Sequence, residues 1–301
     1  MLRQPQSQVK NAFTEPTHRI GDIVWERARE FAAVVNDAEL LTTLRTRKLS
    51  RDRYLAFIAA MYPCVVGFNR ALIRSIAKVD HVRQSGLVKA LAEQLQEEQD
   101  HNQMWRRMLT AYEIDHEEIY RTLVDYMSQF SQRELDRMTK DVLAALTEDL
   151  RDVSPGCFPD PIFPEPVLAL YHHLYITGTH EDVHYWEHFA SQSSMEVIIY
   201  DIVSTSIYPG VVGNPELDLG PESTQWWAEH AKQGSEAMGK RTDEEKHLQL
   251  AQIALNRSAT AESLKTYIAS RAEDTMRLCT AALLAQDKQY GSFPVERYLK
   301  S

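Results

Sequence analysis

The string LAEQLQEEQDHNQMW pairs a glutamate with a histidine at helical spacing. Glu98 and His101 are three residues apart, and Glu97, four residues before the histidine, is an alternative partner. Residues three or four apart share one face of a helix, so the pair can present a carboxylate and an imidazole to one metal ion. A solvated acidic face with an incidental histidine would give the same pattern.

A second string, RTDEEKHLQLAQIAL, repeats this spacing with Glu244 and His247 and places Asp243 four residues before the histidine. These acids have another possible use, because Thr242 followed by Glu245 forms a capping box and acids in a first turn favour the helix dipole. Two such pairs on separate helices are nevertheless typical of carboxylate-bridged two-metal bundles, which add further carboxylates.

Glu196 lies in the apolar string FASQSSMEVIIYDIV, which predicts a buried helix, although its β-branched residues would also fit a short strand. A buried carboxylate must be neutralised, paired or bound to a metal. Glu196 is therefore expected either to form a salt bridge with an arginine or to complete a ligand set drawn from three helices.

Five of the eleven histidines fall between His172 and His188. HEDVH at 180–184 matches the HExxH string of zinc peptidases, but the usual downstream zinc-site context does not accompany it. A polar stripe at steps of about four residues along one long helix consists of His173, Thr177, His180, His184 and His188. We expect the stripe to line a substrate cavity, to supply a substitute metal ligand from His180 or His184, or to form a hydrated face.

Nucleophilic and nucleotide-dependent chemistry have no matching motif, since GxSxG, P-loop and dinucleotide fingerprints are absent from the sequence. Cys64 lies among apolar residues and is expected to be an inert core thiol. The sequence therefore assigns no catalytic residue.

The elements that must position these side chains are helices. Only 11 glycines and 12 prolines occur in 301 residues, and apolar residues recur at three- and four-residue steps. Ser50 is expected to cap a long helix that Pro63 bends, and a third helix is expected to begin at Asp80. This pattern predicts an all-α bundle of about seven to nine helices.

The predicted organisation is a polar arm at 1–19, a single helical domain at 20–290 and a tail at 291–301. Five prolines within SPGCFPDPIFPEP exclude a helix interior and predict a surface strap or lid at 153–166.

Charge and composition limit the partners. Forty-three acidic against 33 basic side chains give a net charge of −10, which disfavours nucleic acids and anionic membranes. The apolar segment Tyr54–Phe68, which contains no charged residue, is too short to span a bilayer. Three distant cysteines and no signal-peptide core indicate a cytoplasmic protein. We expect a small-molecule substrate and a homodimer, the commonest assembly.

Along the chain, the predicted helices are a kinked helix, a helix with the EExxH string, a helix with a buried glutamate, and an acid-rich helix that ends in histidine. It resembles the haem-oxygenase-like di-iron oxidases and oxygenases, which share their fold with TenA and PqqC proteins. The resemblance covers about residues 20–255, with 113–165 as an insertion. The ligands that it implies for two Fe(II) ions are Glu98, His101, Glu196, Glu244 and His247. Lys240 stands where the family has a further histidine, and Glu244 replaces its aspartate, so the second iron site would lack one of the family's ligands.

The resemblance implies an enzyme that uses O2 and non-haem iron on a small amine- or carboxylate-bearing metabolite, with N-oxygenation favoured over desaturation and C–C cleavage. Its cavity would be walled by Trp105, Tyr175, Tyr185, Trp186, Trp226 and Trp227. The alternative, which Lys240 favours, is a TenA- or PqqC-like, metal-independent enzyme or binding protein for a small heterocycle. A non-catalytic helical binding protein is a third hypothesis, if the acids at 243–245 only cap a helix.

Overall fold

The computed structural model describes residues 19–83, 85–148, 150, 155–179, 184–231, 248–249, 251–253, 255–256, 262–288 and 293–300. The α-helices with defined bounds are α2 (Ile20–Asn36), α3 (Glu39–Arg45), α4 (Arg51–Ile76), α5 (Ser85–Ala111), α6 (His116–Met127), α7 (Gln132–Glu148), α8 (Glu165–Thr179), α9 (Tyr185–Ile202), α10 (Tyr208–Val211), α11 (Pro221–His230) and α14 (Glu262–Lys288). A π-helical turn, η1 (Val203–Ile207), and a 3-10 turn, η2 (Val295–Tyr298), complete them. These ranges contain no strand, only one isolated bridge between Ile114 and Leu299. The predicted all-α class is therefore confirmed, and the MEVIIYDIV string is helical.

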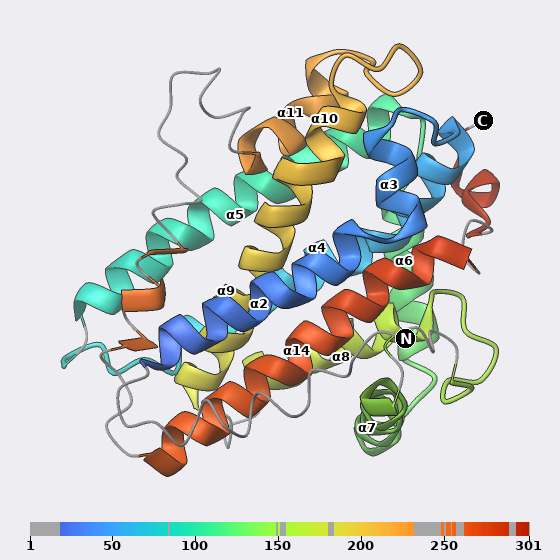
Figure 1. Ribbon diagram of the computed structural model, residues 1–301. Coiled ribbons are helices and arrows are strands. Elements are labelled where there is room, and N and C mark those ends of the chain that lie inside the picture. The colour runs from blue at the N-terminus through green and yellow to red at the C-terminus, as the bar shows by residue number, and fades with distance from the viewer. Residues whose placement is uncertain are drawn as a thin grey trace.

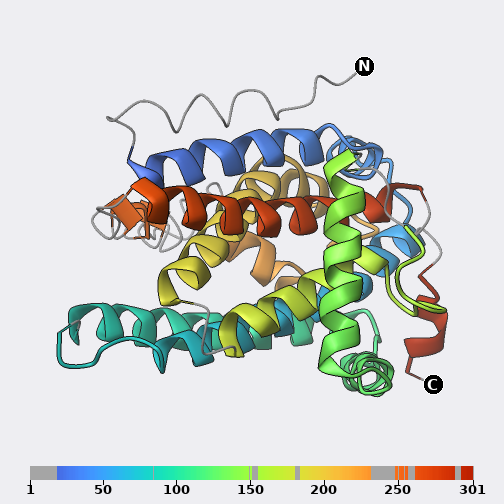
Figure 2. The ribbon, with the colours of Figure 1, turned by 90° about the horizontal axis from the view of Figure 1, so that it is seen from below.

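The long helices form two layers with α9 between them. Helices α2 and α14 lie side by side on one side of the molecule, whereas α5, α4 and α8 lie on the other (Figures 1 and 2). Helix α9 crosses between the layers and packs against α2, α14, α4 and α8. Helix α7 stands across the layers at one end of the molecule (Figure 2). Because α9 has neighbours on several sides, its polar side chains are brought into the interior.

Helix α4 is the apolar centre of its layer. Ser50 caps it as predicted, since Ser50 Oγ accepts a hydrogen bond from Arg53 N at 3.4 Å. The helix continues through Pro63, and Gly67 allows α8 to approach closely, because a Cβ there would lie 3.0 Å from the Tyr171 ring. The helix is long and apolar enough to cross a membrane, but 83% of its most apolar stretch is buried in the protein, as in a core helix.

Helix α5 begins at Ser85, five residues later than predicted. Asp80 does not cap it: Asp80 Oδ1 accepts hydrogen bonds from Val82 N and Arg83 N, both at 3.0 Å. The aspartate thus closes a separate turn before the helix, which its short side chain favours.

The proline-rich strap is tied to the start of α8 and to the core. The buried carboxylate of Glu165 accepts hydrogen bonds from Cys157 N at 3.1 Å and Phe158 N at 3.3 Å. Phe158 and Phe163 are buried, and Phe163 contacts Phe293 with ring centroids 5.3 Å apart. The described part of the strap is therefore anchored by its aromatic residues rather than only laid on the surface.

Candidate functional site

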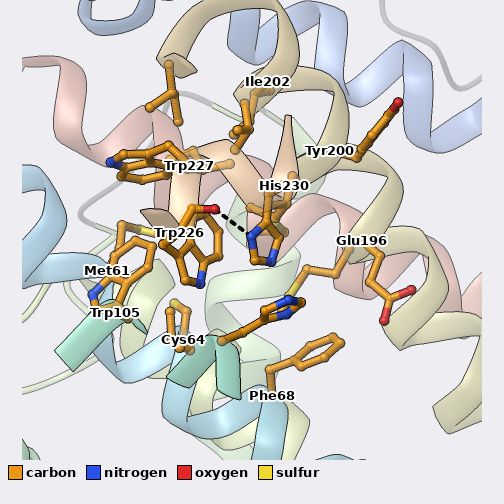
Figure 3. A pocket seen from close by; sticks show the side chains of 18 of the residues that line it. Met61, Cys64, Phe68, Trp105, Glu196, Tyr200, Ile202, Trp226, Trp227 and His230 are labelled. Atoms are coloured by element: carbon orange, nitrogen blue, oxygen red, sulfur yellow. Dashed lines mark hydrogen bonds between the residues drawn. The ribbon is translucent and has the colours of Figure 1, made fainter. Parts of the chain in front are cut away.

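A cavity of about 90 Å³, here called the central cavity, lies among α4, α5, α8, α9, η1, α11 and α14 (Figure 3). Most of its wall is apolar, including Phe57, Met61, Phe68, Leu170, Ile202 and Leu283. The acidic, imidazole and amide groups on its wall are those of Asn69, Glu98, His101, Glu196 and His230. An apolar pocket with a few convergent polar groups is the usual form of a small-molecule site.

Glu98 and His101 reach the cavity together from α5. Glu98 is only 8% exposed, and its Oε2 lies 3.4 Å from His101 Nδ1, an ion-pair distance. Asn69 of α4 donates a hydrogen bond from Nδ2 to the backbone oxygen of Glu98 at 2.9 Å, which fixes this turn of α5 against α4. The pair thus presents a carboxylate and an imidazole side by side to the cavity.

Glu196 lines the same cavity from α9. Its Oε1 accepts a hydrogen bond of 2.6 Å from Gln94 Nε2, so α5 also contacts this carboxylate. The structure therefore brings together three of the five residues predicted as metal ligands, from two helices that are far apart in the sequence.

His230 is a cavity residue that the sequence patterns did not predict. It ends α11, is 7% exposed, and stacks on Trp226 with ring centroids 3.7 Å apart. Its Nδ1 lies 2.8 Å from the Trp226 backbone oxygen; because a carbonyl can only accept, Nδ1 carries the proton (Figure 3). Burial, and then the nearby charge of His101, lower the pKa of His230 well below its usual value, so the ring stays neutral. The rings of His230 and His101 are 4.2 Å apart.

Three tryptophans close one part of the cavity. Trp105 meets Trp226 and Trp227 edge to face at centroid distances of 4.7 and 5.3 Å. Of the aromatic residues predicted as cavity walls, these three line it; three others described in the structure, Tyr175, Tyr185 and Trp186, do not. The spacing of Trp226 and His230, four apart in WWAEH, is the sequence signal that could have pointed to His230.

Cys64 and Cys279 also line the cavity. Burial raises the pKa of the Cys64 thiol well above its usual value and that of Cys279 to about 12. Both thiols therefore stay protonated near neutral pH and are poor nucleophiles.

The remaining predicted site residues do not line the described cavity wall. Glu97 is a half-buried residue of α5 outside the wall. His184 is exposed and caps α9: its Nδ1 accepts from Trp186 N at 3.2 Å, while Glu187 Oε1 accepts from His184 N at 3.0 Å. The predicted residues that lie outside the described part of the chain are His180, Lys240, Asp243, Glu244 and His247.

The single helix predicted for the histidine stripe is wrong, because α8 ends at Thr179 and α9 begins at Tyr185. His173 and His188 are buried away from the central cavity, and His173 Nε2 lies 2.9 Å from Thr275 Oγ1. Burial lowers the pKa of each of these two histidines to about 3. They are neutral core residues rather than a cavity wall.

The described residues alone do not fit a metal centre. Across the described ranges, no group of three or more histidine, cysteine, aspartate or glutamate side chains is placed to hold an ion. Glu98 and His101 would supply one carboxylate and one imidazole, and a complete set would need Glu244 and His247. Iron binding therefore stays a prediction.

Comparisons with known proteins bear on the fold. No protein-family model matches the sequence, and no curated protein matches it. A solved structure of a TenA homolog from Pseudomonas syringae pv. tomato is similar, with a TM-score of 0.60 and 14% identity over 90% of this chain and 94% of that chain. The chain has the haem-oxygenase-like fold. At this identity the similarity extends to the fold and no further.

Proposed function

We propose that the protein is an enzyme that binds a small metabolite in the central cavity and acts on it with the Glu98–His101 pair. The observation that carries the proposal is this pair, held 3.4 Å apart and nearly buried on the wall of a mostly apolar cavity. Among its expected substrates are small amines, carboxylates and heterocycles.

The two histidines would divide the proton chemistry. His101, next to a carboxylate, can accept a proton from a bound molecule and return it. His230 is kept neutral by burial and has its proton fixed on Nδ1 by Trp226, so it can orient His101 or the substrate without adding charge. This version needs no metal, and the TenA-like fold supports it.

A second candidate function is the O2-dependent, non-haem iron oxygenase, with N-oxygenation of a small amine as its first form. The observation that favours it is that Glu98, His101 and Glu196 share one cavity. Iron(II), when bound, would supply the reduction of O2. Two ions would require ligands beyond the described residues.

Anaerobic loading with Fe(II) separates the two functions. We would measure iron per chain, then mix the protein with oxygen in a stopped-flow spectrometer, using a His101→Ala plus His247→Ala double variant and an exposed Glu93→Gln variant as matched control. Two irons per chain in the wild type and the control, lost in the double variant, together with a transient visible band, support the oxygenase. Equal iron content in all three proteins overturns the oxygenase and leaves the metal-independent enzyme.

A further inference from the structure

Trp105 and Trp226 line the central cavity and are 3% and 7% exposed. Each has a buried indole N–H group that lacks a hydrogen-bond partner within the described part of the chain. The third tryptophan of the cluster differs, since Trp227 Nε1 donates a hydrogen bond of 2.8 Å to Tyr54 Oη.

An indole nitrogen is a donor only, and a buried donor is nearly always paired in folded proteins. Leaving it unpaired loses the hydrogen bond that water would have made. Two such donors beside one cavity therefore indicate that an acceptor arrives with the molecule that fills the cavity.

The donors and the carboxylate lie in different parts of the cavity. In Figure 3, Trp105 and Trp226 lie on one side of His230 and Glu196 lies on the other. The two indoles are neighbours, with ring centroids 4.7 Å apart. A molecule in the cavity thus meets hydrogen-bond donors at one end and Glu196 at the other.

We propose that Trp105 and Trp226 bind a carbonyl or carboxylate oxygen of the substrate through their indole N–H groups. The oxygen accepts at the tryptophan end, and the rest of the molecule extends toward His101 and Glu196. This inference rests on the proposed function, because it requires the substrate to occupy the central cavity.

The volume of the cavity limits the size of the substrate beyond its acceptor group. Its volume of about 90 Å³ is smaller than the roughly 150 Å³ of an engineered apolar cavity that binds benzene. A chain of a few carbon atoms beyond the acceptor group therefore fits, and its apolar contacts are available along α4 and α9.

Indole N–H signals in the NMR spectrum of the full-length, 15N-labelled protein test the inference. The five tryptophans give five signals, which single Trp→Phe variants assign. The probes are butyrate, butyramide and butylamine, which share one carbon chain. We expect butyrate and butyramide to move the Trp105 and Trp226 protons downfield, with a smaller change at Trp227. Tighter binding of butyrate identifies a carboxylate ligand, and tighter binding of butyramide identifies a carbonyl ligand.

Affinities of variants provide a second measurement. Trp226→Phe should weaken binding of the preferred acceptor probe roughly 3- to 10-fold, the effect of one hydrogen bond. Trp186→Phe, whose ring is outside the cavity wall, should leave the affinity unchanged.

Two results would overturn the inference and leave the proposed function standing. One is that an acceptor probe binds in the cavity while the Trp105 and Trp226 signals stay in place; the other is that only butylamine binds. If none of the three probes binds, the inference is overturned as well, and heterocycles are the substrates of the proposed function that are left.

Discussion

Among the histidines that the structure describes, His101 differs in its surroundings from the two core residues His173 and His188, so these three form two groups. His101 lies beside Glu98 on the wall of the central cavity, where a proton can be exchanged with a bound molecule. His173 and His188 are buried in the core, where burial lowers each pKa to about 3. The first group is suited to chemistry, and the second makes the stability of the fold depend on pH.

We predict that the protein loses stability as the pH falls below about 6.5, the ordinary pKa of histidine. Between about pH 6.5 and 3 the unfolded chain binds protons at His173 and His188 that the folded chain does not. The free energy of unfolding should therefore fall by up to about 1.4 kcal/mol per pH unit for each histidine. Urea unfolding between pH 7.5 and 5 measures this slope.

Two variants serve as controls for this slope. His188→Gln removes one of the buried imidazoles and should give a shallower slope, whereas His81→Gln, on an exposed turn, should keep the wild-type slope. Equal slopes in all three proteins would show that His188 does not carry the effect.

At the scale of elements, close contacts between backbones decide which substitutions the helices accept. A Cβ at Gly210 of α10 would lie 2.5 Å from the backbone oxygen of Leu44, a buried residue of α3. A Cβ at Gly86 of α5 would meet nothing within 4 Å. The two glycines are thus a matched pair, one in a tight contact and one in open space.

Gly210→Ala should destabilise the protein by about 1–3 kcal/mol, because α10 and α3 must move apart. Gly86→Ala should be neutral or stabilise it by up to about 1 kcal/mol, because alanine favours the helix. Thermal unfolding of both variants checks this prediction. Equal melting temperatures for the two would contradict the close approach of α10 to α3.

The strap is a second test at this scale. Glu165→Ala removes the acceptor for Cys157 N and Phe158 N, so we expect a loss of roughly 1–3 kcal/mol in stability and faster proteolytic cleavage within 155–164. Glu165→Gln keeps one acceptor oxygen and should be affected less. Cleavage at the wild-type rate in both variants would show that the carboxylate does not hold the strap.

At the scale of the whole molecule, the site exists because α9 passes between the two helical layers. That course places Glu196 beside Gln94 of α5, and α11 then brings His230, Trp226 and Trp227 over the same cavity. The haem-oxygenase-like fold thus provides a site whose wall is built from several helices.

The assembly and location of the protein stay predictions from the sequence. For a homodimer, light scattering coupled to size-exclusion chromatography should give twice the chain mass of 34.6 kDa. A mass of one chain at micromolar concentration would contradict it.

Local patterns in the sequence were sufficient for the all-α class and for one part of the site, but they missed the break between α8 and α9. Ser50 caps α4, and the three-residue spacing of Glu98 and His101 puts both on one face of α5, because capping and helical periodicity depend on near neighbours. Helix starts were less predictable where an aspartate could close a turn instead, as at Asp80.

Only the tertiary structure decided which residues share a cavity. His173 and His230 are both histidines on helices, yet one is a core residue and the other faces His101, since the packing of α8 and α11 against distant helices determines their surroundings. The tertiary structure likewise distinguishes the three tryptophans. Trp227 Nε1 has a hydrogen-bond partner, whereas the Nε1 atoms of Trp105 and Trp226 have none within the described residues. The sequence by itself thus determined the helical class and the pairing of residues within a turn. The convergence of α5, α9 and α11 depends on long-range packing, which no local spacing records.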